Sequence, residues 1–336
     1  MAVCGALFLA AFAINSAARA AVRPSGIARA GDVSGLLAAA QRQFNSGNYT
    51  NAIGTLQSAL AVNSQNAEAQ YWLGRSYYEL RDYDNAVTAA EKSVALDAKN
   101  SLYHQWLGRI YGGKAGRDHS FFTARKVKKE FEMAVQLNPS NISARRDLEE
   151  YCLDAPMIVG GSKDEAKAQV DAIAALDPVE GHLARGDFYA QQKKPDLAEK
   201  EYREVLNASP SRLEFYLEVA DFFEAQNKPA DMSTAVEAGA QKTGNDPRLA
   251  YYRGASRVLG GTEPSQAEEY LKSYIASTPQ RSDWPSHASA RELLGQLYES
   301  QGKSTDAAEQ YRAALQLNPD MKAARLRLEK LEKASR

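Results

Sequence analysis

The chain has 336 residues, with 41 Lys and Arg against 42 Asp and Glu, 4 His and 2 Cys. A formal net charge of −1 gives no global basic field, which argues against a general nucleic-acid-binding protein. Two cysteines are too few for a disulfide scaffold or a four-thiolate metal site. A hydrophobic content of 44% with 25% charged residues is typical of a folded globular protein.

An apolar run at residues 2–14 stands near the start of the chain. It is shorter than the roughly 20 residues that a membrane-spanning helix needs. Ala18 and Ala20 follow in an A-x-A arrangement, which predicts a signal peptide at 1–20 that is cleaved after Ala20. No Lys or Arg precedes the run, so a loosely packed or disordered N-terminal helix is the alternative. We expect a periplasmic or secreted protein, a linker at 21–32 and no membrane span in the mature chain.

The rest of the chain repeats one pattern: a small residue in a first helix, a polar turn, and an Ala that opens a second helix. Residues 67–100 and 288–321 show it most clearly, with Gly74 and Gly295 as the small residues. This resembles the tetratricopeptide repeat, a helix-turn-helix unit of about 34 residues. The resemblance implies an all-α, right-handed α-solenoid whose neighbouring repeats bury each other's apolar faces.

The spacing of the second-helix Ala and its equivalents predicts a solenoid at 33–321. Its eight repeats are expected at 33–66, 67–100, 101–141, 142–178, 179–212, 213–246, 247–281 and 288–321. Residues 322–336 keep helical periodicity and carry many charges, which is expected of a C-terminal capping helix.

The resemblance also implies a function, because proteins of this family mostly bind peptides or proteins and seldom catalyse reactions. The first helices of their repeats line a concave groove. Carried over to this chain, that wall contains Tyr71, Arg75, Tyr78, Gln105 and Arg109. Tyr and Arg are enriched at binding hot spots. We therefore predict a non-enzymatic scaffold that holds a protein or peptide partner, of unidentified nature, against these residues; ordinary solvated helix positions are the alternative.

Acidic residues occupy the equivalent positions farther along the chain. They include Asp187, Asp221 and Glu224. The groove is therefore expected to run from a Tyr/Arg end to an acidic end, a polarity that could orient an extended ligand.

The third repeat has extra residues between its helices, and residues 114–129 carry six Lys or Arg against Asp118 alone. Four of them form a predicted basic site: Arg125, Lys126, Lys128 and Lys129. One interpretation is a basic protrusion tipped by Phe121 and Phe122, which would make the protein an accessory factor for envelope assembly or export. Its binding to an anionic partner should fall steeply with salt. The alternative is a longer second helix with a solvated basic face and both Phe side chains folded onto the solenoid.

A second irregular segment, 154–163, contains Pro156 and the pair Gly160-Gly161. It is expected either to form a rigid binding edge or to act as a connector that redirects the solenoid.

No motif predicts catalysis or a cofactor. Gly108–Lys114 matches G-x-x-x-x-G-K, but Ala115 stands where a phosphate-binding loop needs Ser or Thr. The four His show no metal-ligand spacing, and Cys152 has no His nearby in the sequence. We expect no metal, no cofactor and no enzymatic activity; a site near His119 and Cys152 is the remaining enzymatic alternative.

Overall fold

The computed structural model describes residues 32–334. The predicted signal peptide and nearly all of the predicted linker lie outside the described residues. Among the described helices, none combines the length and the apolar character that crossing a membrane requires.

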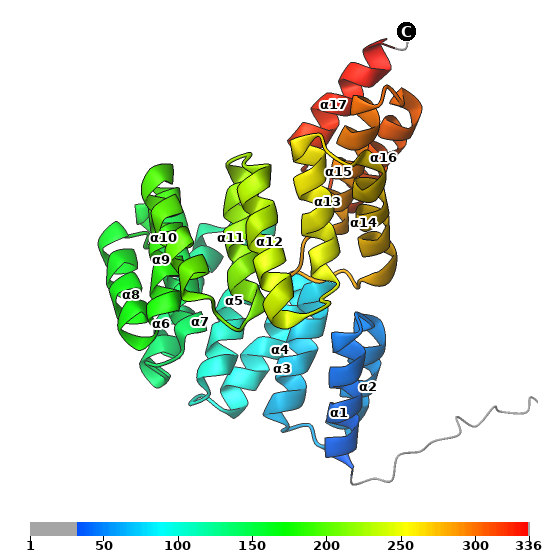
Figure 1. Cartoon of the computed structure of the whole chain (residues 1–336). Helices are drawn as coiled ribbons and strands as arrows, with labels where there is room; N and C mark the ends of the chain where they lie inside the picture. The colour runs from blue at the N-terminus through cyan, green and yellow to red at the C-terminus, as the bar shows by residue number, and fades with distance from the viewer. Residues whose placement is uncertain (1–31, 335–336) are drawn as a thin grey trace, which may run out of the picture. The chain divides into compact units, whose positions relative to one another are not determined.

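Residues 32–334 form α-helices, one short 3-10 helix and no strand, and consecutive helices pack together in pairs (Figure 1). The helices are α1 (Val33–Asn45), α2 (Tyr49–Val62), α3 (Ala67–Glu79), α4 (Tyr83–Leu96), α5 (Ser101–Asp118), α6 (Phe121–Leu137), α7 (Ile142–Asp154), η1 (Met157–Val159), α8 (Lys163–Leu176), α9 (Pro178–Gln191), α10 (Pro195–Ala208), α11 (Leu213–Ala225), α12 (Pro229–Thr243), α13 (Arg248–Gly260), α14 (Pro264–Ser277), α15 (His287–Ser300), α16 (Ser304–Leu317) and α17 (Lys322–Ala334). The predicted all-α solenoid of helix-turn-helix repeats is confirmed.

The sequence encodes the starts of these helices locally. The side chain of Asn66 accepts a hydrogen bond from the backbone N–H of Ala69, 2.7 Å away, and so caps α3. Proline opens α9, α10, α12 and α14, where its fixed φ suits the first turn and its missing N–H costs nothing. Short turns between capped helices leave each helix beside its sequence neighbour.

Glycines on the first helices let the two helices of a repeat approach closely. A Cβ built on Gly186 of α9 would lie 2.8 Å from the ring of Tyr202 on α10. A Cβ on Gly108 of α5 would lie 2.5 Å from the ring of Phe131 on α6. Side-chain atoms do not pack at such short distances. A residue larger than glycine would therefore clash with the aromatic ring at these positions, which explains the small residue of the repeat pattern.

The core is shared between successive repeats. One cluster of buried apolar side chains runs from Leu183 on α9 to Ala324 on α17. Ala324 is fully buried, and Leu328 and Leu331 pack against the same cluster. Helix α17 thus covers the apolar end of the array and exposes its charged face, as a solenoid cap must.

The extra residues of the third repeat are helical. Helix α5 has 18 residues and α6 has 17, whereas the preceding pair, α3 and α4, has 13 and 14. Ser120 caps α6 through the N–H of Thr123, so only a short turn separates the two long helices. Phe121 and Phe122 are 65% and 85% exposed and are not folded onto the solenoid.

The connection between α14 and α15 contacts the first two repeats. The Tyr49 hydroxyl donates to the carbonyl oxygen of Gln280 at 2.8 Å. The backbone N–H and the hydroxyl of Ser282 each donate to the Glu79 carboxylate at 2.9 Å. This connection therefore bounds the groove beside α3.

Candidate functional site

Arg75, one of the predicted groove residues, lies in an aromatic cluster formed by three successive repeats. Its guanidinium carbon is 4.7 Å from the ring centre of Phe44, 4.6 Å from that of Trp72 and 4.0 Å from that of Trp106. It also donates to the Tyr71 hydroxyl at 3.0 Å. These cation–π contacts join the repeats to one another.

Tyr71 and Gln105 are mostly covered by the neighbouring repeat. Tyr71 is 6% exposed and stacks on Tyr103, with ring centres 5.2 Å apart. Gln105 is 2% exposed and donates to Ser143 at 2.8 Å and to Asp147 at 2.7 Å. Both side chains offer little accessible surface, and a direct contact with a partner stays a prediction.

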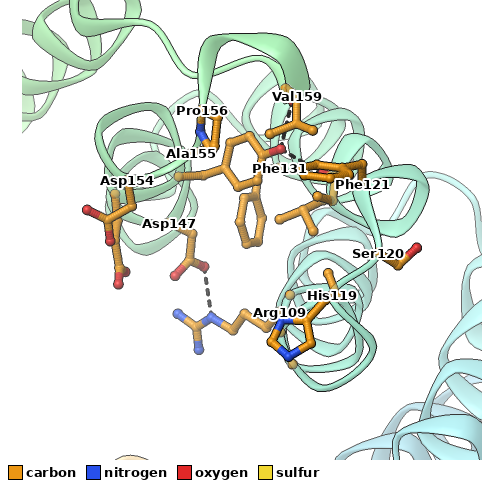
Figure 2. A pocket seen from close by; sticks show the side chains of 18 of the residues that line it. Arg109, His119, Ser120, Phe121, Phe131, Asp147, Asp154, Ala155, Pro156 and Val159 are labelled. Atoms are coloured by element: carbon orange, nitrogen blue, oxygen red, sulfur yellow. Dashed lines mark hydrogen bonds and ion pairs between the residues drawn. The ribbon is translucent and has the colours of Figure 1, made fainter.

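Tyr78 and Arg109, in contrast, line an open cavity of about 730 Å³, which we call the central pocket (Figure 2). Arg109 donates through Nε to Asp147 on α7 at 2.8 Å, and this pair lies at one side of the cavity. The rest of the lining is mainly apolar and comes from α5, α6, α7 and the segments between these helices and before α8. It includes Gly112, Gly116, Phe121, Ala124, Val127, Phe131, Tyr151 and Val159, with Glu150 and Asp154 as acidic residues.

The two irregular segments of the sequence build the central pocket together. The Tyr151 hydroxyl on α7 lies 2.7 Å from the carbonyl oxygen of Ala124 on α6 and 2.8 Å from that of Val159 on η1. Arg125 donates to the carbonyl oxygen of Ile158 at 3.1 Å. The long α5 and α6 and the connector containing η1 are therefore tied into one wall.

Three of the four residues of the predicted basic site have partners within the chain. Besides Arg125, Lys128 donates to the Gly160 carbonyl oxygen at 3.0 Å and lies 2.5 Å from the Glu165 carboxylate. Lys126 is 3.8 Å from Glu91. Lys129 is exposed on α6. A contact of these residues with an anionic partner stays a prediction.

A second cavity, of about 570 Å³, lies along α7, α9 and α11, and we call it the acidic pocket. Arg146 is its one basic lining residue. The Arg146 guanidinium lies 2.5 Å from Asp187 and 2.9 Å from Glu218, and 3.6 Å from Glu180 at its side. One cation of the fourth repeat therefore holds together carboxylates of the fifth and sixth repeats.

Glu149 lines the acidic pocket and is buried, with 2% of its surface exposed. Its Oε1 atom has no hydrogen-bond partner among the described residues. Burial raises the pKa of Glu149 to about 8, and the neighbouring Asp187 carboxylate adds to the shift. Within residues 32–334, no group of three or more His, Cys, Asp or Glu side chains is arranged to hold a metal ion.

The remaining enzymatic alternative was a site near His119 and Cys152. His119 lines the central pocket, whereas Cys152 is 1% exposed within the core of its repeats. Burial raises the pKa of the Cys152 thiol to about 11. Since the thiolate is the nucleophile, burial favours the unreactive thiol form of Cys152 at neutral pH.

The cavities adjoin one another along the first helices. A smaller cavity beside Arg75 shares Tyr78 and Arg109 with the central pocket. The central and acidic pockets share Glu150. An extended ligand could therefore meet an aromatic and Arg-containing end, an apolar pocket and an acidic pocket in that order.

Arg146 and Glu149 were not among the predicted site residues, although both lie on the first helix of the fourth repeat. A signal was present, since Arg146 precedes Asp147, Glu149 and Glu150 on the same helix. Because residues three apart share a helix face, Arg146 and Glu149 could have been assigned to one wall.

Comparison with known proteins agrees with the repeat pattern. The tetratricopeptide repeat family matches residues 37–101, 160–212 and 252–322, together more than half of the chain. No curated protein matches the sequence.

Yeast Tom70 is similar in structure, with a TM-score of 0.63 and 14% identity over 94% of this chain and 66% of its own. A tetratricopeptide repeat protein from Parabacteroides merdae has a TM-score of 0.50 and 16% identity, over 79% of this chain and 98% of its own. The structure of the APC/C hetero-tetramer Cut9-Hcn1 gives a TM-score of 0.50 and 12% identity, over 88% of this chain and 55% of that one. The matched residues, with the helix pairs that they form, show that this chain belongs to the tetratricopeptide repeat family.

Proposed function

We propose that the protein is a non-enzymatic scaffold that binds an extended segment of a protein or peptide partner along the adjoining cavities of its first helices. The observation that carries this proposal is the central pocket, which adjoins the other two cavities. The repeat fold is itself typical of protein-interaction scaffolds, and one structurally similar protein was solved within a hetero-tetramer.

The central pocket suits an apolar side chain of such a segment. Of its apolar lining residues, Val127 and Phe131 are buried, whereas Phe121 is exposed. Specific binding pockets combine an apolar lining with a few placed polar groups, and here the Arg109–Asp147 pair supplies them. Because most of the lining residues lie on packed helices, we expect the pocket to be formed before the ligand arrives, which lowers the entropic cost of binding.

The alternative function, an accessory factor for envelope assembly or export that binds an anionic partner through the basic site, has less support. Arg125 and Lys128 donate to carbonyl oxygens of the 157–160 segment, so they already stabilise the wall of the central pocket. Binding that falls steeply with salt and that is lost on Lys129→Ala would favour this alternative.

The site of binding can be tested by filling the central pocket. A Cβ on Gly112 would meet no heavy atom within 4 Å, so Gly112→Trp places a large side chain in the cavity without a clash at its root. We expect peptides selected from a random displayed library on the full chain to lose at least about tenfold in affinity for this variant. Fluorescence anisotropy with a labelled selected peptide measures the change.

The matched control is Gly54→Trp on α2. Gly54 is exposed, lies outside the described cavities and also has no atom within 4 Å of a built Cβ. The Gly54→Trp variant should bind the selected peptide with the same affinity as the unsubstituted protein. Equal binding by the Gly112 and Gly54 variants, or a library that yields no binder, would contradict the proposed function.

A further inference from the structure

The acidic pocket is lined by more acidic groups than basic groups of the chain. Its lining holds five carboxyl groups and one guanidinium. The carboxyl groups are Glu149, Glu150, Asp187, Glu218 and Asp221. Arg146 forms ion pairs with Asp187 and Glu218, at distances of 2.5 and 2.9 Å. Three carboxyl groups therefore face the cavity without a basic partner among its lining residues.

We propose that this pocket binds a basic side chain, Lys or Arg, of the same partner segment whose apolar side chain enters the central pocket. This inference rests on the proposed function and narrows the partner to a segment in which a basic residue accompanies an apolar one. Glu150, which lines both pockets, places the two side chains next to each other.

Glu149 gives an observation that is independent of the charge count. Glu149 is a lining residue of the pocket and is almost completely buried, and its Oε1 atom has no hydrogen-bond partner among the described residues. Leaving a buried carboxyl oxygen without a partner costs free energy, and an ammonium or guanidinium group in the pocket would supply the missing donor.

The apolar part of the lining fits a long basic side chain better than a small inorganic cation. Leu153, Ala190 and Phe222 stand among the carboxyl groups. Lys and Arg have apolar stems that pack on such surfaces while the charged end reaches an acid. The described carboxyl groups, moreover, are not arranged as a metal site. An anionic segment would be repelled by the excess of carboxylates.

The test compares peptide selection and affinity on the full-length protein. We expect peptides selected on the unsubstituted chain to be enriched in Lys or Arg relative to the starting library. The comparison is made at pH 9, above the pKa of about 8 of Glu149 and the pKa of about 7 of Asp221, so that both groups are ionised in the parent. The double variant Glu149→Gln/Asp221→Asn then removes two carboxylates with little change in volume and should bind such a peptide at least about tenfold more weakly. The control Asp306→Asn/Glu309→Gln, on exposed positions of α16, makes the same charge change and should bind as the parent does.

A change on the peptide side keeps the test decisive even if the double variant folds poorly. Replacing the basic residue of the selected peptide by Gln should weaken binding to the parent protein by a similar factor, and should cause little further loss on the folded double variant. Selected peptides that lack basic residues, or that tolerate their replacement, while Gly112→Trp still excludes them, would overturn this inference and leave the proposed function standing. A library without any binder would overturn both.

Discussion

Replacing Arg146 with Met is expected to lower the free energy of unfolding by about 3 kcal/mol at pH 8. Arg146 is the cation between Asp187 and Glu218, and Glu180 and Glu149 are close by. Removing it leaves carboxylates of three repeats facing one another in a partly buried setting, and these repel. Because a solenoid is stabilised by contacts between neighbouring repeats, the loss falls on the interfaces that join the fourth, fifth and sixth repeats.

Lowering the pH should reduce this loss, because protonation of the carboxyl groups removes their repulsion. Urea unfolding at pH 8 and pH 5, followed by circular dichroism, measures both values. The control is Arg203→Met, since Arg203 lies 2.7 Å from Glu199 and 2.9 Å from Asp231 in an exposed network. That change should cost no more than about 1 kcal/mol. A loss of the same small size for both variants would show that Arg146 is an ordinary surface residue.

The variant Glu149→Gln is expected to gain stability relative to the parent as the pH rises. The pKa of Glu149 is raised from 4.5 to about 8, chiefly by burial and by Asp187, with Glu150 and Asp154 in the same direction and Arg146 opposing. Between these pH values the folded chain keeps a proton that the unfolded chain has lost. The stability contributed by this proton is therefore present at low pH and is lost as the pH rises to about 8.

Gln at this position does not titrate, so it adds no such pH dependence to the unfolding free energy of the variant. The difference in unfolding free energy between variant and parent should grow in favour of the variant between pH 5 and pH 8, by at most roughly 1.4 kcal/mol per pH unit. Urea titrations of both proteins at a series of pH values give this difference directly, and Glu309→Gln on the exposed face of α16 serves as the control. A constant difference across the range would mean that Glu149 titrates normally and is not enclosed as described.

The repeat architecture was predictable because it depends on a local pattern that recurs. Glycine facing an aromatic ring, as in Gly186 with Tyr202, is a contact between the two helices of one repeat. Such residues lie at a fixed distance in the sequence, so their spacing carries the information. The helix caps and the proline starts add signals of the same local kind.

The surroundings of the predicted groove residues were not predictable in the same way. Arg75 occupies a position that is open on an isolated helix, but Phe44 of the preceding repeat and Trp106 of the following repeat enclose it. Which side chains close over a position depends on the stacking of neighbouring repeats, and a helical pattern alone does not specify this. The same applies to Gln105, whose partners Ser143 and Asp147 come from the next repeat.

The central pocket was missed for a related reason. The extra length of the third repeat was evident, but length does not distinguish a protruding loop from two longer helices. The side chain of Ser120 caps the start of α6, so the extra residues belong to two longer helices. The contact between Arg125 and Ile158 then joins this repeat to the connector of the fourth repeat. A pocket formed by two irregular segments can be recognised only once both are placed in space.

Photo-crosslinking can show whether a peptide lies in the groove of the first helices. A photoreactive amino acid is introduced in place of Gly112, at the central pocket, and separately in place of Gly54 on α2, and each full-length protein is irradiated with a selected peptide. We expect a crosslinked product from position 112 and none from position 54. Equal crosslinking at both positions, or crosslinking from position 54 alone, would contradict this placement of the peptide.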